Sequence, residues 1–240
     1  MTTRTAYTVV ANGVLTGRRP VGRRQRWTYV LDDPVSPYLA TLQIGRYVVT
    51  QLDSVVPGRL IHPARLQDAV TSAFADHGRM MAFFVDCFGP YPYASYDVVV
   101  TDDALEIPLE SATLSTFGSN HATRDWENQR LIAHELAHQW FGNCLTAAQW
   151  RDIWLHEGFA CYAEWLWSQE VGLDSTQEQA ARHHQGLAAQ SQDLLLCDPG
   201  PKNMFDDRVY KRGALTLHAL RGAIGDEAFF AVLRGFVADH

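Results

Sequence analysis

The 240-residue chain is 47% hydrophobic and 20% charged, the composition of a globular protein large enough to bury a core. Its formal net charge of −7 argues against a protein built as a whole to bind polyanions, so we expect no nucleic-acid partner. No apolar run approaches the roughly 20 residues that span a bilayer, and residues 1–10 lack the charged and apolar regions of a signal peptide. We expect a cytoplasmic protein without a membrane span.

Four cysteines are spread along the chain, at Cys87, Cys144, Cys161 and Cys197. No two of them have the C-x-x-C spacing of metal-binding or redox motifs. We expect free thiols, which are typical of proteins in a reducing compartment.

Residues 1–61 predict β-strands. Segments 6–13, 26–33 and 38–51 are rich in β-branched and aromatic residues and are separated by Gly, Pro and Asp. Between the first two, the stretch GRRPVGRRQR carries an arginine cluster: Arg18, Arg19, Arg23, Arg24 and Arg26. Such a cluster could bind a nucleic acid, but in an acidic chain we expect a solvent-exposed hairpin tip.

Helical periodicity replaces the strand pattern after Pro63, a residue that suits a first helical turn. The stretch GPYPY at 89–93 is expected to end this helix. A short apolar strand is predicted at 95–102. A further strand is predicted at 105–117, and Pro108 would confine it to a sheet edge.

The remaining sequence predicts helices. The first runs from about Thr123 to Phe141, with Thr123 as its N-cap and Gly142 in the left-handed position past its end. The second runs from about His156 to Glu170. Further helical stretches and one loop follow: a helix over 176–196, the loop 197–203, a helix from about Val209, and a helix over 226–240.

The stretch HELAHQW at 134–140 has the spacing of a metal site. On a helix, His134 and His138 lie four residues apart and share a face, so both imidazoles can bind one ion. Glu135 lies about 100° further round the helix, beside the ion rather than on it. The motif is short enough to occur by chance, but its apolar flanks favour a metal, since buried polar groups need partners.

A catalytic zinc ion takes three protein ligands and keeps a fourth position open for water. The stretch WLHEGFA at 154–160 offers the third ligand, because Glu157 opens the second helix with eighteen residues between it and His138. His156 faces another side of that helix and is left out. We expect one Zn²⁺ ion, bound by His134, His138 and Glu157.

These motifs resemble the aminopeptidase N family of zinc metallopeptidases, gluzincins with the pattern H-E-x-x-H-x18-E. The resemblance rests on HELAHQWFGN and WLHEGFA, and it extends through VYKRGALTLHALR at 209–221 and YLATLQIGRY at 38–47. It covers most of the chain, and the motifs follow the order of the family. It implies a zinc aminopeptidase that acts on peptides with a free N-terminus.

The resemblance also implies an α+β fold class, with a thermolysin-like catalytic domain preceded by the last strands of an all-β N-terminal domain. We place the C-terminal part of the β-rich domain at 1–61 and the catalytic domain at 62–240. Family members usually carry a longer β domain in front and a helical domain behind. We expect the C-terminal helical domain to be absent from this chain, and the sequence leaves the oligomeric state open.

Two residues are candidates for the chemical steps. Glu135 is placed to take a proton from the metal-bound water and to pass it to the departing amine. In the family, a tyrosine ahead of a KGA-like helix stabilises the oxyanion, and the matching residue is Tyr210 in VYKRGA. Without the resemblance, Tyr210 would be read as a half-buried structural tyrosine.

The family reads the free α-amine of its substrate with a glutamate in a G-[AG]-M-E-N motif. The matching stretch is IPLES at 107–111, with Glu110 in the place of the glutamate, 24 residues before His134. The other positions depart from the motif. Pro108 removes a strand donor and Ser111 is shorter than Asn, so we expect altered substrate pairing along this edge. The alternative for Glu110 is an exposed strand carboxylate.

Glu164 lies seven residues after Glu157, on the same face of the second helix. Two interpretations stay open for it. It either orients a zinc-binding histidine through a hydrogen bond or forms an ordinary surface ion pair.

Rival functions also stay open. A zinc-binding remnant without turnover fits a chain that lacks the helical domain, which would wall the cavity. A zinc endopeptidase with an open cleft would have no need of Glu110. A remnant often loses its base or its tyrosine, and both Glu135 and Tyr210 are present. Binding of a nucleic acid by the arginine cluster ranks last.

Overall fold

The computed structural model describes residues 1–239 of the protein, which form two compact units. The first unit combines Met1–Ala82 with Tyr91–Gln139. The second combines Phe83–Pro90 with the residues from Trp140 on. The predicted domain boundary between residues 61 and 62 falls inside strand β7 (Arg59–Pro63) and stays a prediction.

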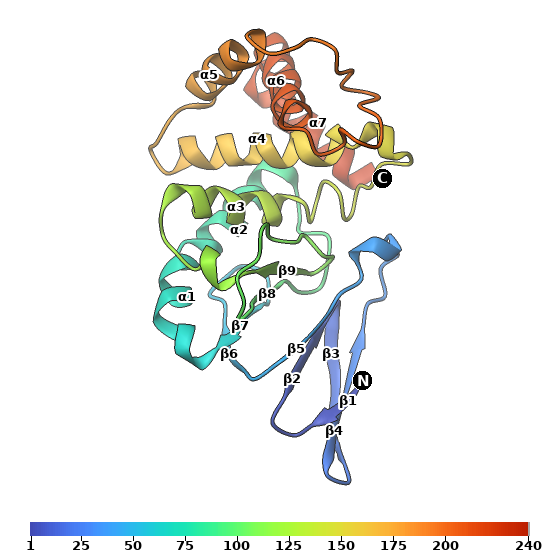
Figure 1. Ribbon diagram of the computed structural model, residues 1–240. Helices are drawn as coiled ribbons and strands as arrows, with labels where there is room; N and C mark the ends of the chain where they lie inside the picture. The colour runs from blue at the N-terminus through green and yellow to red at the C-terminus, as the bar shows by residue number, and fades with distance from the viewer. Residues whose placement is uncertain (240) are drawn as a thin grey trace. The chain divides into compact units, whose positions relative to one another are not determined.

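The first unit begins with two small antiparallel sheets (Figure 1). One has the strand order β1-β4-β3, and in the other β2 pairs with β5. Their bounds are β1 Thr2–Arg4, β2 Thr8–Ala11, β3 Val14–Val21, β4 Arg24–Val30 and β5 Leu42–Gly45. A 3₁₀ turn, Pro37–Leu39, precedes β5. These strands confirm the β-rich character predicted for the N-terminal residues.

The arginine cluster lies on the β3–β4 hairpin, as predicted. Gly22 at the turn has a φ of 60°, which glycine adopts without strain. Arg19 and Arg26 are direct partners across the ladder, and both are exposed. The guanidinium of Arg18 lies 4.5 Å from the ring centroid of Trp27. The hairpin is therefore a solvent-exposed ribbon.

A four-stranded sheet with the order β6-β7-β8-β9 forms the core of the first unit. The strands β6 (Tyr47–Gln51) and β7 pair antiparallel, whereas β8 (Asp97–Val100) and β9 (Leu114–Phe117) continue the sheet in parallel. Every residue of β8 and β9 is buried, which explains the apolar run Val98–Val100 in β8. Strand β9 also buries two polar residues, Ser115 and Thr116. One core cluster joins Val10, Ile61, Val99 and Leu114.

The helix predicted from Pro63 is wrong at its start and in its continuity. Pro63 is extended, with ψ 140°, and its pairing with Tyr47 ends the β6–β7 ladder. A 3₁₀ turn, Ala64–Leu66, follows, and the helical residues divide into α1 (Gln67–Ala73) and α2 (His77–Phe88). Pairing within the sheet outweighs the local preference of proline for a first helical turn. The predicted end of this helix before GPYPY is confirmed.

The strand predicted over 105–117 is shorter than expected. Only Leu114–Phe117 form β9, and the residues before it are irregular except for one antiparallel bridge between Leu109 and Thr116. Because β9 is the last strand of the sheet order, Leu109 lies at a sheet edge, as predicted. The strand prediction at 95–102 is confirmed by β8.

The helix α3 spans Trp126–Ala137 and is capped by Asp125 rather than by Thr123. The Asp125 carboxylate accepts the backbone N–H of Asn128 at 3.0 Å, while the Thr123 hydroxyl donates to that carboxylate. Asp125 directly precedes the first helical residue, and its charged side chain also complements the partial positive charge of the helix N-terminus. The helix ends at Ala137, four residues before the predicted end at Phe141. Gly142 has a positive φ of 124°, but it does not directly follow the helix as predicted.

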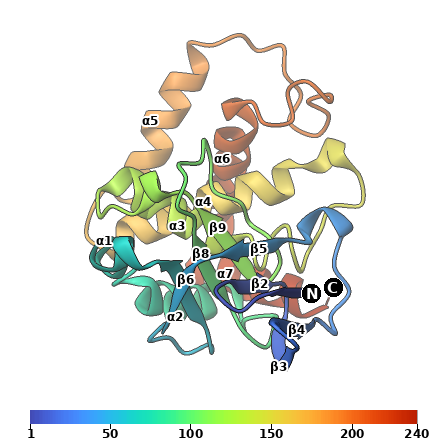
Figure 2. The same cartoon turned by 60° about the horizontal axis from the view of Figure 1, so that its bottom comes forward.

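Helices dominate the second unit, where Figures 1 and 2 show α6 beside α4. Their bounds are α4 Trp154–Glu170, α5 Thr176–Ala188, α6 Asp207–Ile224 and α7 Asp226–Asp239, with a 3₁₀ turn at Trp150–Asp152 before α4. Gly172, with a φ of 78°, follows the end of α4, as the sequence predicts.

The structure of residues 1–239 bears on two expectations, free cysteines and the lack of a membrane-spanning helix. The four cysteines are free thiols in this range, and Cys87 and Cys161 are buried. None of the helices there combines the length and the apolar character that crossing a membrane requires.

Candidate metal centre and active site

The last turn of α3 carries His134 and Glu135, and His138 is the C-cap residue directly after it. The backbone N–H of His138 donates to the His134 carbonyl at 3.2 Å, so the helical spacing of the two histidines persists. Their ring centroids lie 4.7 Å apart. His134, Glu135 and His138 are each less than a tenth exposed. The structure thus confirms two adjacent imidazoles on one helical end, with a buried carboxylate beside them.

The sequence of α3 explains this burial. Ile132, Ala133, Leu136 and Ala137 are all buried, so apolar residues surround the polar ones. Burying a charged or polar group is costly unless it has a partner. A cluster of buried imidazoles and a carboxylate within such a helix is typical of a binding site rather than of a structural core.

Helix α4 carries the third predicted ligand. Glu157 lies in its first turn and is 6% exposed. A carboxylate in the first turn is favoured by the partial positive charge of the helix N-terminus.

His134, His138 and Glu157 form a group that could hold a metal ion. Each offers one ligand atom, and these atoms all lie within 4.8 Å of one another. Two imidazole nitrogens and one carboxylate oxygen are a donor set that zinc accepts in catalytic sites, where a fourth position stays open. The residues therefore fit the ion that the sequence predicts.

Helix α6 carries Tyr210, which is half-buried. Three residues further along, Gly213 makes a very close contact with Gly158 of α4. A Cβ added at Gly158 would lie 2.7 Å from the Gly213 Cα, so only glycine fits at this crossing. Because Gly158 adjoins Glu157, the same contact fixes the spacing between Glu157 and Tyr210 along the two helices.

Glu110 is half-buried and directly follows the Leu109 bridge. The N–H and the carbonyl of Leu109 both pair with Thr116, at 2.9 Å each, so the missing donor of Pro108 does not interrupt this pairing. Glu110 thus begins the irregular turn that leads back to β9. The structure places Glu110 next to a bridge at a sheet edge, and its role toward a substrate amine stays a prediction.

The sequence interpretation missed Gln139, which holds this turn. Its amide oxygen accepts the backbone N–H of Thr113 at 2.8 Å, and its amide nitrogen donates to the Ser111 carbonyl at 3.2 Å. Gln139 is fully buried and directly follows His138. It therefore ties the turn after Glu110 to the end of the metal-binding helix. In the sequence, only the position of Gln139 inside the motif HELAHQW could have pointed to a role at the site.

Glu164 is 5% exposed, so it is not an ordinary surface carboxylate. It lies near Lys211, whose ammonium donates to the Cys161 sulfur at 3.4 Å. Burial lowers the pKa of Lys211, but the negative groups around it, Glu164 among them, raise the pKa above its ordinary value. Orientation of a metal-binding histidine by Glu164 stays a prediction.

Two further residues near the motifs have structural roles. The His156 ring nitrogen Nε2 accepts the backbone N–H of Ala147 at 2.8 Å, which agrees with leaving His156 out of the ligand set. Burial is the main cause that raises the pKa of the Cys161 thiol to about 12, so this cysteine is a poor nucleophile.

Comparisons with known proteins show which family the chain resembles. A family model described as "Peptidase family M1 domain" matches residues 72–240. Human endoplasmic reticulum aminopeptidase 1 is 26% identical over 235 residues, which are 89% of this chain and 24% of the relative. Leucine aminopeptidase 2 of Candida glabrata is 30% identical over 159 residues, which are 65% of this chain and 24% of that protein.

Solved structures are similar over nearly the whole chain. The crystal structure of an M1 zinc metallopeptidase from Deinococcus radiodurans has a TM-score of 0.87 and 33% identity, covering 99% of this chain and 55% of that one. A mutant M1 zinc metallopeptidase from the same organism, bound to a Tyr-Ser-Ala substrate, has a TM-score of 0.88 with the same identity and coverage.

The chain spans about a quarter of the length of the curated relatives described above. The family model nevertheless covers more than half of this chain and includes all the candidate site residues from Glu110 to Tyr210. The α+β fold with its helical catalytic part agrees with the M1 structures. The chain belongs to peptidase family M1.

Proposed function

We propose that the chain is the catalytic part of a zinc-dependent aminopeptidase, which removes the first residue from peptides with a free N-terminus. The observation that carries the proposal is the buried group of His134, His138 and Glu157, with Glu135 next to its first histidine. Membership of peptidase family M1, together with relatives named as aminopeptidases, supports the same activity.

In this proposal His134 and His138 bind the ion as neutral imidazoles and Glu157 binds it as a carboxylate. Zinc bound there would lower the pKa of a water molecule to about 7 and polarise the carbonyl of the scissile bond. Glu135 accepts the proton of the attacking water. It then passes that proton to the nitrogen of the leaving amine, so one carboxylate acts first as base and then as acid.

The Tyr210 hydroxyl donates a hydrogen bond to the oxygen that becomes negatively charged as the carbonyl is attacked. A fixed donor lowers the barrier because it stabilises this charge more strongly than the neutral carbonyl. The half-buried position of Tyr210, packed at the start of α6, supports a donor of fixed orientation.

Glu110 sets where cleavage occurs. Its carboxylate pairs with the ammonium group of the substrate N-terminus, so that the first peptide bond reaches the metal-binding residues. The sheet-edge position of Glu110 supports this role, since an extended peptide can pair with such an edge. An endopeptidase would show no preference for a free amine, and a remnant would show no turnover.

The test uses alanyl, leucyl and arginyl anilides, each with a free and with an acetylated amine. We expect turnover of the free amines only, and a loss of about 10³-fold in Glu135→Ala. Equal turnover of acetylated substrates would replace the proposal with an endopeptidase. Absence of Glu135-dependent turnover in a protein that still binds one zinc ion would leave a non-catalytic remnant. The cytoplasmic location expected from the sequence stays a prediction.

A further inference from the structure

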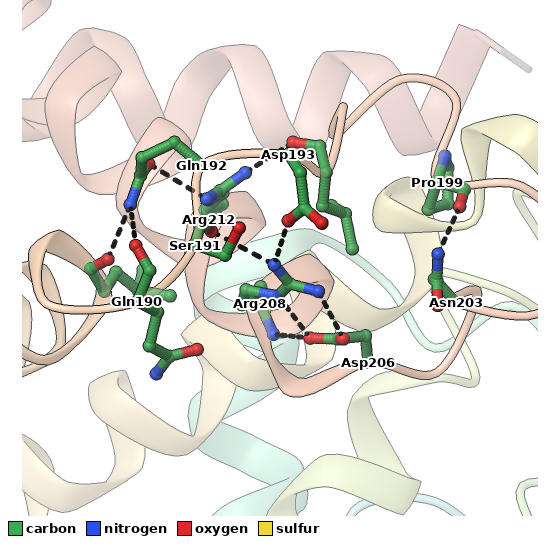
Figure 3. Close-up of polar contacts among 11 residues, drawn as sticks. Gln190, Ser191, Gln192, Asp193, Pro199, Asn203, Asp206, Arg208 and Arg212 are labelled. Carbon is green, nitrogen blue, oxygen red and sulfur yellow. Dashed lines mark hydrogen bonds and ion pairs between the residues drawn. The ribbon is translucent and has the colours of Figure 1, made fainter.

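The connection between α5 and α6 is a long segment without helix or strand. It covers residues 189–206, between the end of α5 at Ala188 and the start of α6 at Asp207. Connections longer than about 12–15 residues are uncommon in compact domains and are usually functional when they are ordered. Figure 3 shows how two arginines of α6, Arg208 and Arg212, hold this segment.

Arg208 forms a network at the start of α6. Its guanidinium donates to both carboxylate oxygens of Asp206, at 2.9 and 2.8 Å, and Asp206 also accepts the Arg208 backbone N–H at 2.9 Å. The same guanidinium donates to the Ser191 carbonyl at 3.1 Å and to Asp193 at 2.7 Å. The Arg208 side chain is only 15% exposed and that of Asp206 28%, whereas the Asp193 side chain is 71% exposed, so the network lies at the surface with its arginine largely covered. Arg208 thereby joins both ends of the 189–206 segment.

Arg212, one helical turn further, binds two residues in the first part of the 189–206 segment. One of its terminal nitrogens donates to the Leu194 carbonyl at 2.6 Å, and the other donates to the Gln192 side chain at 3.1 Å. Gln192 in turn donates to the carbonyls of Leu187 and Gln190, at 2.8 Å each. The two arginines therefore fix residues 190–194 against α6 over several consecutive positions.

The residue that they fix supports the ring of Tyr210. Leu194 is buried in a cluster with Ile153 and Val209, and Tyr210 packs against this cluster. Val209 and Tyr210 are neighbours on α6, whereas Leu194 reaches the cluster from the connecting segment. Leu196 and Met204 of the same segment also pack against the cluster, and the bonds from Arg208 and Arg212 add polar anchors beside these apolar contacts.

We propose that Arg208 and Arg212 are positioning residues for the Tyr210 hydroxyl, which they hold through Leu194 and its cluster. This inference rests on the proposed function, because it assigns the arginines to the same oxyanion donor. An arginine suits the task because its planar, rigid fork can bind two acceptors in fixed directions. A lysine at position 212 could satisfy one of the two acceptors and would restore only part of the effect.

The experiment measures kcat and KM for leucyl anilide in Arg212→Gln, Arg208→Gln, Arg212→Lys and Tyr210→Phe, and in the double variant of Arg212→Gln with Tyr210→Phe. We expect Arg212→Gln to lower kcat by about 10- to 100-fold with KM nearly unchanged, since a misplacement of about 1 Å can cost 10²-fold. Arg212→Lys should fall between Arg212→Gln and the parent protein. The double variant should be no slower than Tyr210→Phe alone, because both changes remove the same interaction.

Arg182→Gln is the matched control. Arg182 belongs to α5 and forms an exposed ion pair with Asp174, outside the Leu194 cluster, so its loss should leave kcat unchanged. Normal kcat in Arg212→Gln, or losses that multiply in the double variant, would overturn the proposal, because a merely structural arginine acts independently of Tyr210.

Failure of the proposed function can be told apart from failure of the inference. If the parent protein shows no Glu135-dependent turnover, crystal structures of the parent and of Arg212→Gln decide. A displaced or disordered Tyr210 ring in the variant would keep the positioning role, and an unchanged ring would overturn it.

Discussion

Two parts of the candidate site are held in place by different means. Glu157 and Tyr210 lie on α4 and α6, whose crossing is fixed by the backbone contact between Gly158 and Gly213. Glu110 lies in an irregular turn, which is held by side chains that bond to its backbone. Gln139 binds this turn at Ser111 and Thr113.

The turn after Glu110 also depends on a residue far away in the sequence. The Asn12 side-chain nitrogen donates to the Ala112 carbonyl at 2.5 Å, across 100 positions of the chain. Thr113 adopts a φ of 63°, which is uncommon for a β-branched residue and persists only where its surroundings impose it. The helix crossing is thus set by a backbone contact between two regular helices and the turn by side-chain hydrogen bonds, so the two parts should fail in different ways.

The largest effect is expected from breaking the helix crossing with Gly158→Ala. The added Cβ would meet backbone atoms of Gly213 at 2.7 Å, and these cannot move without shifting α6. Overpacking of this kind costs about 3 kcal/mol, which corresponds to a fall in Tm of roughly 6–12 °C. Because Glu157 adjoins Gly158, zinc affinity should also fall, by about 10-fold. Thermal unfolding and zinc titration measure the two effects.

Gly222→Ala on α6 is the matched control, since an added Cβ there would meet nothing within 4 Å. It should raise the free energy of unfolding by about 0.5–1 kcal/mol, because alanine loses less backbone entropy than glycine in a helix. Equal behaviour of the two alanine variants would show that the helices do not cross through these glycines.

The second effect concerns the irregular turn and substrate binding. We expect Glu110→Gln to lower kcat/KM for free-amine anilides by about 100-fold, since a hydrogen-bonded charge pair with the substrate ammonium is worth about 1.5–3 kcal/mol. Tm should stay nearly constant, because Glu110 is only half-buried. Glu106→Gln removes an exposed carboxylate from the same stretch and should leave kcat/KM unchanged. Comparable losses in both variants would point to a general effect of charge.

The third effect tests whether the long-range bonds hold the turn. Gln139→Leu leaves the buried Thr113 N–H and the Ser111 carbonyl without their partner, which should cost about 2 kcal/mol of stability. It should also raise KM for free-amine substrates, because the turn carrying Glu110 loses its anchor. Denaturant unfolding and steady-state kinetics measure the two quantities.

Gln129→Leu provides the comparison for that variant. Gln129 is another buried glutamine, inside α3, and it donates to the Ala73 carbonyl at 2.8 Å, away from the turn. It should show a similar loss of stability with an unchanged KM. If both glutamine variants raise KM alike, the effect belongs to α3 as a whole and not to the turn.

The same contrast explains what the sequence could predict. Helical spacing places His134, Glu135 and His138 on one helical end, and the interval to Glu157 follows from the motif alone. Glu110 was assigned only through the resemblance to a family, because no periodic pattern describes an irregular turn. Asn12, which binds the turn at Ala112, lies 100 positions earlier in the chain, and the periodicity of a short sequence window cannot connect the two.

One wrong prediction, at Pro63, and one pair of helical glycines that propensity disfavours have the same origin. Pro63 has the local preference of a first helical turn, yet its pairing with Tyr47 keeps it in a strand. Gly158 and Gly213 weaken a helix by propensity and are nevertheless required where two helices meet at backbone distance. In each case the deciding contact comes from another part of the chain, so the conformational preference of the residue itself does not explain its place in the fold.

The smallest effect is expected at Asp206, the N-cap of α6, where the contribution of the capping oxygen to stability can be separated from that of the negative charge. Asp206→Ala removes the acceptor for the Arg208 N–H and should lower the free energy of unfolding by about 1 kcal/mol at pH 7. Asp206→Asn keeps a capping oxygen and should lose less stability.

The Arg208 guanidinium holds the pKa of Asp206 down to about 2, below its ordinary value of 3.8. The charged pair therefore contributes its full stability above pH 3.8 and loses it as the pH falls toward 2. Urea unfolding of the metal-free protein should show the parent and Asp206→Asn converging over that interval, while Asp206→Ala stays less stable than Asp206→Asn throughout. A constant difference between the parent and Asp206→Asn from pH 7 to pH 2 would mean that the cap, and not the charge, joins the 189–206 segment to α6.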